Sequence, residues 1–533
     1  MRVAGSCLAA LFVTYLLGSP ALAAGGSTSE PIPPAPSPDH PPSGTDQWNV
    51  LFLTVDALRA DRMGLYGHDR DTTPYLERLA RESFVFDNCF ANGAWTSPGI
   101  ISMLTGLHPP AHGQGTRFDY VDDEIVTPLD VLGKEHGFRT IARDTDSPTY
   151  RGVGLKIAYR PVLHENMEVV DWLAGQDERW VAWVHIKPTH LPYDPPPYHL
   201  RRFGGDRLDT DGIRAIRSSG TVYPQDYGLS WNPPVIPSFS PEEQAVVRDL
   251  YDGEVADADD QVGRIVERLR ERGLLDHTLV VITADHGEEL FDHGWVGHAS
   301  TGYQGKVTDE LTHIPLIIRV PGGQHVGRSA ALVQQSDLMP TLFELLGADV
   351  GKTDAGFQGV SLAPLLAGRE AATHDVVFSR TTFKGWTTPL AESRDGATAA
   401  RDATRKLIRL RRDGQVSHQA FDLVADPAEQ TDLWATDPER FADLAAAMDA
   451  WEADNVEVGA KVVFAAAERH LADLEEAAKD GDAVGAARTW LALLELERTY
   501  ANEWSPPLQD RRYAGRWSRV KRRAQVLRDR ASK

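Results

Sequence analysis

Val50-Leu-Phe-Leu-Thr-Val-Asp56 is the stretch of this 533-residue chain that decides its fold. Its apolar run is typical of a buried strand in an open α/β sheet, and Asp56 follows at the carboxyl end, where such sheets bind ligands. The run Thr278-Leu-Val-Val-Ile-Thr-Ala-Asp285-His286 repeats the pattern. The sequence therefore predicts that Asp56, Asp285 and His286 meet at one edge of the sheet. Carboxylate oxygens and an imidazole together suit a divalent cation.

A hydroxyl group is expected at the same edge. In the stretch Asn92-Gly-Ala-Trp-Thr-Ser-Pro-Gly, Pro98 suits the first position of a helix that Gly106 ends. Thr96 would then lie just outside the helix N-terminus, where free N–H groups and the helix dipole favour an alkoxide or an anionic ester. Ser97, next to the proline, can take the capping role and leave Thr96 available for chemistry.

Several short motifs resemble the sulfatase family of the alkaline-phosphatase superfamily. They are Val55-Asp-Ala-Leu-Arg-Ala-Asp61, Leu65-Tyr-Gly67, Thr96-Ser-Pro98 with Leu104-Thr-Gly106, Lys187-Pro-Thr-His-Leu-Pro-Tyr193, Asp285-His-Gly-Glu288 and Asp292-His-Gly-Trp-Val-Gly-His298. The resemblance implies an alkaline-phosphatase-like α/β fold, with a mixed, mostly parallel sheet flanked by helices and a small C-terminal antiparallel sheet subdomain. Helical periodicity beyond these motifs adds a helical tail.

The resemblance also implies a metal site. Asp56, Thr96, Asp285 and His286 would hold one divalent metal ion, with Ca, Mn, Mg and Zn all open. Many sulfatases use an amide at the place of His286 and carry a second aspartate at the place of Ala57. These two departures favour manganese, zinc or magnesium over a sulfatase-type calcium shell.

Two further departures decide the expected chemistry. The sulfatase signature is Cys or Ser, any residue, Pro, any residue and Arg, and its first residue is oxidised to formylglycine. This chain has Thr96 and Ile100 at the two diagnostic places. Oxidation of a threonine would give a ketone, so Thr96 is expected to act as an unmodified hydroxyl nucleophile. By the same resemblance, His190 or His298 would give a proton to the leaving oxygen.

The missing aldehyde favours phosphorus over sulfur as the reacting atom. The hydrate of formylglycine has a second hydroxyl that expels sulfate, whereas a sulfo-threonine would need water to attack sulfur. A phospho-threonine can be cleared by metal-assisted attack of water at phosphorus. We therefore expect a hydrolase or transferase of phosphate esters or phosphonates. A sulfatase with altered nucleophile chemistry is the alternative, and a catalytically silent binding protein is a second one, because the signature arginine is absent.

The chain is expected to divide into five parts. Residues 1–23 have the apolar stretch and small-residue cleavage site of a signal peptide, and residues 24–47 have the Pro-, Gly- and Ser-rich composition of a linker. A sulfatase-like catalytic domain is expected over 48–370, a C-terminal α+β subdomain over 371–455 and a helical tail over 456–533. The protein is thus predicted to be exported to the periplasm or the cell exterior, without a transmembrane segment.

The amino-acid composition limits the kinds of molecule that the protein is expected to bind. The formal net charge of −22 argues against nucleic-acid binding, so the expected substrate is a small-molecule, glycan-derived or lipid-derived anionic ester that the site handles locally. The basic residues 511–533 are expected to be a solvated helix face, with contact to an anionic surface as the alternative. Once the signal peptide is removed, Cys89 is the only cysteine, which excludes an intrachain disulfide and predicts a buried thiol.

Overall fold

The computed structural model describes residues 48–116, 119, 121–143, 167–218, 239–298, 306–351, 353–369, 373–383, 396–501 and 506–532. The expected signal peptide (1–23) and linker (24–47) lie outside the described residues, and their assignment stays a prediction. No described helix is long and apolar enough to cross a membrane.

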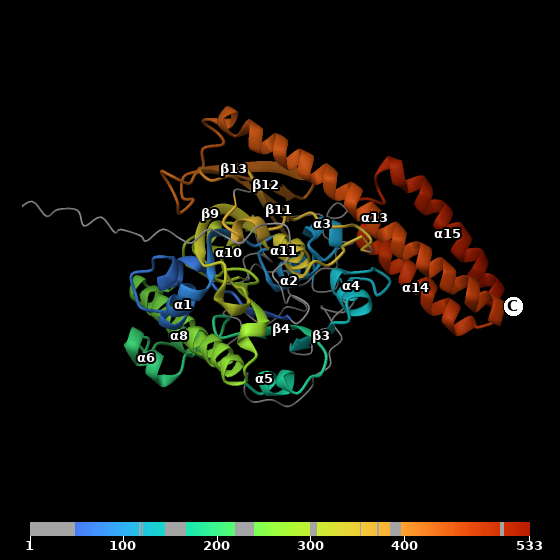
Figure 1. Cartoon of the computed structure of the whole chain (residues 1–533). Helices are drawn as coiled ribbons and strands as arrows, with labels where there is room; N and C mark the ends of the chain where they lie inside the picture. The colour runs from blue at the N-terminus through green and yellow to red at the C-terminus, as the bar shows by residue number, and fades with distance from the viewer. Residues whose placement is uncertain are drawn as a thin grey trace, which may run out of the picture. The chain divides into compact units, whose positions relative to one another are not determined.

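A seven-stranded mixed sheet forms the centre of the described chain (Figure 1). The strand order is β3-β4-β1-β5-β8-β2-β9; β3, β4, β1 and β5 are mutually parallel, β8 is antiparallel to both of its neighbours, and β9 is parallel to β2. The strands are β1 (Asn49–Val55), β2 (Phe84–Phe90), β3 (Arg139–Arg143), β4 (Trp180–Ile186), β5 (Thr278–Ala284), β8 (His313–Arg319) and β9 (Gly327–Gln334). The predicted fold class, a mostly parallel sheet with helices, is confirmed.

The apolar runs that predicted β1 and β5 are buried along almost their whole length. From Val50 to Val55 and from Thr278 to Ala284 every residue is buried, as in a sheet covered on both faces. Cys89, in β2, is also fully buried, and burial raises the pKa of its thiol well above the usual value. The expected role of Cys89 as a buried apolar residue agrees with this position.

Helices pack around the sheet in two groups. The long helix α8 contacts α1, α5, α6 and α7, and α2 contacts α3, α4 and α11. A capping box opens α8, where the side chain of Ser240 accepts from the N–H of Glu243. The helices are α1 (Pro74–Leu79), α2 (Thr96–Thr105), α3 (Pro109–His112), α4 (Pro128–Glu135), α5 (Met167–Ala174), α6 (Pro197–Phe203), α7 (Asp211–Ser218), α8 (Pro241–Glu271), α10 (Asp309–Thr312), α11 (Leu338–Leu346) and α12 (Ala363–Leu366).

The predicted C-terminal antiparallel sheet is present. Its strands are β10 (Val377–Thr382), β11 (Gly396–Arg401), β12 (Arg405–Arg412) and β13 (Gln415–Asp422), and a separate two-stranded ladder joins β6 (Glu289–Leu290) to β7 (Val296–Gly297). One face of the sheet, including Leu407, packs on helix α13 (Ala442–Asp480). The other face, including Ile408 and Phe421, contacts Ala94, two residues before Thr96. The small sheet therefore supports the turn that carries the predicted nucleophile.

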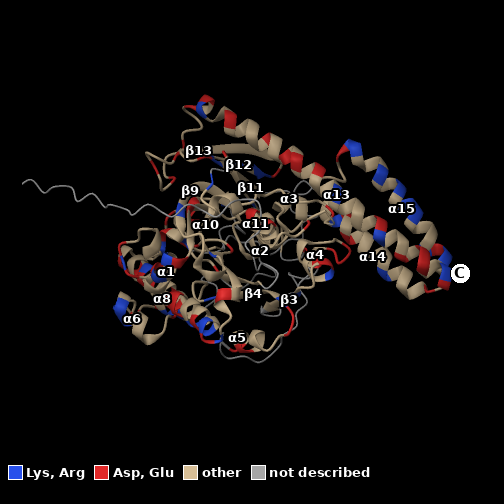
Figure 2. Ribbon diagram, viewed as in Figure 1, with Lys and Arg blue, Asp and Glu red and all other residues tan. Residues whose placement is uncertain are grey.

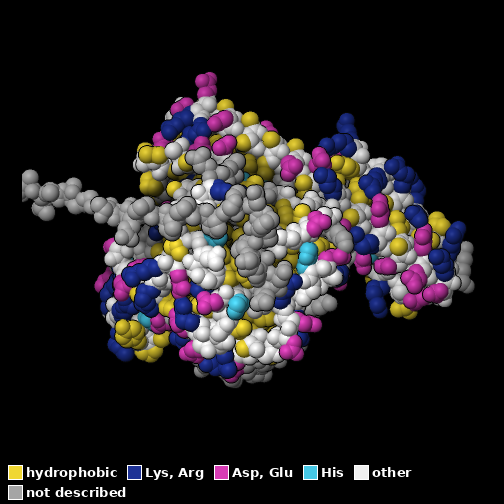
Figure 3. All heavy atoms as spheres, viewed as in Figure 1, with side chains coloured by type: hydrophobic (Ala, Val, Ile, Leu, Met, Phe, Trp, Pro, Cys, Tyr) yellow, Lys and Arg dark blue, Asp and Glu magenta, His cyan; other side chains and the backbone are white. Residues whose placement is uncertain are grey.

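The tail is a set of three helices, α13, α14 (Ala483–Tyr500) and α15 (Arg511–Ala531). The predicted helical hairpin breaks at Gly481, whose φ of 66° is the left-handed conformation of a helix C-cap. Helix α13 is continuous across 455/456, the boundary expected between the last two parts. Lys and Arg positions recur along the ribbon of α15 (Figure 2), and their side chains gather over this helix in the space-filling view (Figure 3). Contact of this segment with an anionic surface stays a prediction.

One close approach joins α2 to the end of β5. A Cβ atom added at Gly99 would lie 2.3 Å from the carbonyl oxygen of Asp285. Glycine is therefore required at this position for α2 to rest against the carboxyl end of the strand.

Gly99→Ala should lower the free energy of unfolding by roughly 1–3 kcal/mol, because the added methyl group overpacks a backbone contact. Gly133→Ala, inside α4, is the matched control, since its methyl group would meet its nearest atom, the carbonyl oxygen of Phe138, at 3.5 Å. This control should gain up to about 1 kcal/mol from helix propensity. Urea unfolding of both variants measures the difference, and equal stabilities would contradict the close approach.

Candidate functional site

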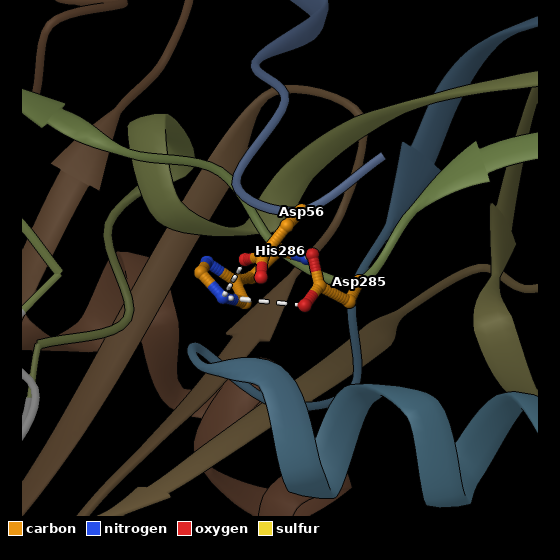
Figure 4. Close-up of side chains that lie close together, drawn as sticks. All are labelled: Asp56, Asp285 and His286. Carbon is orange, nitrogen blue, oxygen red and sulfur yellow. Dashed lines mark hydrogen bonds and ion pairs between the residues drawn. The ribbon is translucent and has the colours of Figure 1, made fainter. Parts of the chain in front are cut away.

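Three polar side chains meet at the carboxyl ends of two neighbouring strands. Asp56 follows β1, and Asp285 and His286 follow β5; the parallel register pairs Val55 with Ala284, so the two aspartates leave the sheet side by side. Figure 4 shows the three side chains pointing toward one another. His286 Nε2 lies 3.6 Å from Asp56 Oδ1 and 3.5 Å from Asp285 Oδ2. The sequence prediction that these residues come together is therefore borne out by the geometry.

Each aspartate has one oxygen that the protein satisfies and one that it does not. Asp285 Oδ1 accepts from the backbone N–H groups of Ala57 and His286, at 3.0 and 2.9 Å. Asp56 Oδ2 accepts from His185 Nε2 at 3.2 Å. The buried atoms Asp56 Oδ1 and Asp285 Oδ2 have no hydrogen-bond partner in the described chain. Two unsatisfied carboxylate oxygens aimed at one point are costly without a cation and fit one well.

His286 presents the lone pair of its Nε2 to the same point. Its Nδ1 lies 2.6 Å from the carbonyl oxygen of Gly287, which can only accept, so Nδ1 carries the proton. Burial lowers the pKa of His286, which favours the neutral ring. A neutral imidazole whose second nitrogen is held by a backbone carbonyl is the usual state of a metal-ligating histidine. Carboxylate oxygens and this nitrogen therefore form a suitable ligand set for one divalent cation.

Thr96 joins this cluster, but from a different helix position than predicted. Its Oγ1 lies 3.3 Å from His286 Nε2. Helix α2 begins at Thr96, with Trp95 as the N-cap and no side-chain cap, so the expectations that the helix starts at Pro98 and that Ser97 caps it are wrong. The apolar packing of the turn, where Pro98 and Ser97 are buried, extends the helix by one half turn. The first N–H groups of α2 still lack intrahelical partners beside Thr96.

His298 and His190 lie next to the cluster. The ring of His298 is 4.5 Å from that of His286 and 4.8 Å from that of His190, centroid to centroid. Nδ1 of His190 donates to the carbonyl oxygen of Leu191, and Nδ1 of His298 donates to Glu288 Oε1, at 2.5 and 3.0 Å. Each ring is thus oriented through Nδ1.

The two histidines have opposite pKa shifts. Burial opposes the proton on both rings, but the negative charges of Asp56 and Glu288 outweigh burial at His190 and raise its pKa. Burial and the neighbouring His190 lower the pKa of His298 to about 4. His190 is therefore the better placed of the two to carry a proton near neutral pH.

Several supporting residues were not singled out from the sequence. Glu288, fully buried, joins His298 to the hydroxyl of Tyr193, which donates to Glu288 Oε2 at 2.9 Å. Gln335 accepts from the N–H of Asn92 and donates to the carbonyl oxygen of Asp285, at 2.9 and 2.7 Å, so it ties the Thr96 turn to the end of β5. A charged residue two positions after His286 was a visible signal for Glu288. Gln335 had no such signal, because only the fold brings it to the site.

A cavity of about 430 Å³ lies on the face of β12 and β13 that contacts Ala94. This face gives the cavity apolar side chains such as Ile408 and Phe421 and polar ones such as Gln419, and Val307 in its wall packs with Ala94 in one cluster. His293, Lys306 and Glu429 add charged groups to the lining. The cavity is large enough for the non-reacting part of a small ester.

Comparison with known proteins finds relatives that are named as sulfatases. The family model described as Sulfatase matches residues 48–348. Arylsulfatase K of Xenopus laevis is 24% identical over 464 residues, which are 76% of this chain and 82% of the relative, and the ulvan-active sulfatase of Formosa agariphila is 25% identical over 412 residues, 72% of this chain and 76% of the relative.

Solved structures share the fold at lower identity. The phosphonate monoester hydrolase of Agrobacterium radiobacter superposes with a TM-score of 0.58 at 21% identity, over 77% of this chain and 95% of that chain. A 2-O GAG sulfatase superposes with a TM-score of 0.57 at 19% identity, over 77% and 92% of the two chains. Proteins that act on different esters thus share this arrangement of strands.

Asp285→Asn should reduce the bound divalent metal by at least about tenfold, because the charged oxygen that faces the cluster is lost. Asp259→Asn is the matched control: this buried carboxylate accepts from the N–H groups of Tyr75 and Leu76 and lies outside the cluster. Both variants and the wild type are loaded with manganese or zinc, desalted and analysed for metal. Equal retention in all three proteins would place the metal elsewhere.

Proposed function

The chain belongs to the sulfatase family and is a sulfatase-like ester hydrolase, and on that premise we propose that it cleaves phosphate esters or phosphonates with Thr96 as the nucleophile. One observation carries the proposal. Thr96 Oγ1, His286 Nε2 and the unsatisfied oxygens of Asp56 and Asp285 converge on one point. A hydroxyl placed there is suited to attack an ester that is bound at the same point.

The residues that would hold the cation are Asp56, Asp285 and His286, with Thr96 Oγ1 as a further ligand. A bound divalent cation would supply Lewis acidity and lower the pKa of the Thr96 hydroxyl. A ligand set with one imidazole nitrogen favours manganese, zinc or magnesium over calcium.

The proposed reaction has two steps. Thr96 Oγ attacks phosphorus and releases its proton to solvent, the bond from phosphorus to the ester oxygen breaks, and His190 or His298 gives a proton to the leaving oxygen. Water then attacks phosphorus and gives one proton back to that histidine, the phosphorus–Oγ bond breaks, and Thr96 takes a proton from solvent as phosphate or phosphonate departs. Both histidines support this role because each is anchored through Nδ1, with His298 beside His286 and His190 beside His298.

The substrate is proposed to be an anionic ester of a small molecule, a glycan or a lipid. Two of the relatives are named for sulfated polysaccharides, ulvan and GAG. The cavity on the face of β12 and β13 that contacts Ala94 offers a place for the non-reacting part of the ester. We further propose that the protein acts after export, on the strength of the signal-peptide pattern in residues 1–23.

A sulfatase is the second candidate, and the sulfatase relatives favour it. Thr96 has a single hydroxyl, so release of sulfate would need attack by water at sulfur. A silent binding protein is the third candidate, motivated by Ile100 in place of the signature arginine. The unsatisfied carboxylate oxygens count against it, since a protein without metal chemistry has no reason to keep them buried.

Turnover on matched aryl esters tests the choice between phosphorus and sulfur. The purified protein is supplied with manganese, zinc, magnesium or calcium and assayed on 4-nitrophenyl sulfate, phosphate, phenylphosphonate and a phosphodiester. The phosphorus esters should be cleaved with a kcat/KM above that of the sulfate. Faster cleavage of the sulfate would establish the sulfatase, and turnover of none of them by metal-loaded protein would support the silent protein.

Thr96→Ala should reduce turnover by about three orders of magnitude or more, as loss of a covalent nucleophile does, while fold and bound metal persist. Thr96→Ser keeps the hydroxyl and should retain substantial activity. Ser97→Ala is the control in the same turn, and since Ser97 does not cap α2 it should alter rate and stability little.

The mass of the peptide that spans residues 92–113 completes this test. It should show an unmodified threonine at position 96, because no formylglycine can form there. Activity of Thr96→Ala within about tenfold of wild type would instead assign the attack to water.

A further inference from the structure

Helix α15 is basic in a protein whose formal net charge is −22. One side of the helix, including Trp517, Val520 and Leu527, is buried against α13 and α14. Lys and Arg positions recur along its ribbon (Figure 2), and Lys and Arg side chains gather over the helix in the space-filling view (Figure 3). The local charge of α15 is therefore opposite in sign to the net charge of the protein.

Seven of the nine cations of α15 fall into two sets, and the other two, Arg512 and Arg528, pair with the nearby Asp510 and Asp529. The first set is used inside the tail: Arg516 pairs with Glu468 at 2.7 Å, Lys521 with Glu497 at 2.8 Å, and Arg523 with Glu475. These carboxylates belong to α13 and α14, so the pairs hold the three helices together. The expected solvated helix face is therefore only part of what this segment does.

The second set, which we call the arginine row, consists of Arg511, Arg519, Arg522 and Arg530. All four are exposed, and none makes an ion pair or hydrogen bond with another residue of the described chain. At 100° per residue they fall within a sector of about 100°, opposite the buried side, and they span about 28 Å along the axis. The single carboxylate of the helix, Asp529, is engaged by Arg528 and Gln525.

We propose that the arginine row binds an acidic polysaccharide that runs along α15. The guanidinium fork of arginine matches the oxygens of sulfate and carboxylate groups in pairs, and four forks in line offer repeated contacts to a repeating polyanion. The charge of the row is complementary to such a chain, whereas the acidic remainder of the protein is not.

Other anionic partners fit the row less well. A bilayer would gain little, because the apolar side of α15 is already buried and only Val526, 52% exposed, lies among the arginines. Single-stranded nucleic acid uses aromatic side chains for stacking, and the row has none. A duplex would bring its phosphates against the acidic surface around the tail. A narrow polysaccharide follows the row without these costs.

Binding of the full-length protein to heparin at several salt concentrations tests the proposal. Arg519→Gln with Arg522→Gln should lower the affinity at least about fivefold and reduce the slope of log affinity against log salt by about two. The matched control is Arg516→Gln with Arg523→Gln, which removes the same charge from the same helix but from the paired set. It should keep the affinity within about twofold and the slope unchanged.

Three further arms decide the partner. Neutral dextran should not bind, and turnover of a small aryl ester should be the same in both double variants and the wild type, which shows that the fold and the catalytic centre are intact. Equal loss of heparin affinity in both variants would overturn the proposal. So would row-dependent binding to phosphatidylserine vesicles or to DNA with heparin left unbound.

Discussion

Two buried carboxylates at the carboxyl edge of the central sheet impose the main constraint on this structure. Asp56 and Asp285 are each nearly or fully inaccessible to solvent, and each leaves one oxygen unsatisfied. Such charges are tolerated only if the surrounding groups fix them and a cation balances them. The parallel pairing of β1 with β5 places them side by side, and His286 faces both. The fold around this edge is arranged to keep that cluster in one geometry.

The loop after β1 shows how this is done. Ala57, in the left-handed region with φ of 59°, turns its N–H to Asp285 Oδ1. The hydroxyl of Tyr251, from α8, donates to the carbonyl oxygen of Ala57 and accepts from the N–H of Arg59. Arg59 in turn pairs with Asp292 at 2.6 Å, in the loop that leads to His298. The turn thus holds Asp285 Oδ1 in place while Oδ2 faces the cluster.

The fold and the metal cluster were accessible from the sequence because both depend on short-range patterns. An apolar run that ends in Asp56 or in Asp285-His286 predicts a buried strand with polar side chains at its carboxyl end. This prediction does not depend on which strands lie beside it. The start of α2 was misplaced by two residues, since Pro98 suits a first helical position as well as the third. Gln335 was not found, because its contact to Asn92 spans 243 positions in the chain and exists only after β9 and β2 pair. The sequence also could not show which arginines of α15 form ion pairs, because their carboxylate partners lie on other helices.

The absence of the signature arginine and the presence of three histidines at the site have a common physical explanation. Ile100 lies one helical turn after Thr96 on α2 and is fully inaccessible within the main core. A guanidinium at that place would be a buried charge in need of a carboxylate partner, whereas isoleucine packs without one. Positive charge for the reacting group must then come from elsewhere around the cluster. In the proposed reaction His190, whose pKa Asp56 and Glu288 raise, would supply this charge, and the first N–H groups of α2 would add a partial charge. Asp56, Asp285 and His286 are buried, and charges beside buried groups are screened less than in water, so fewer formal charges would serve the same purpose.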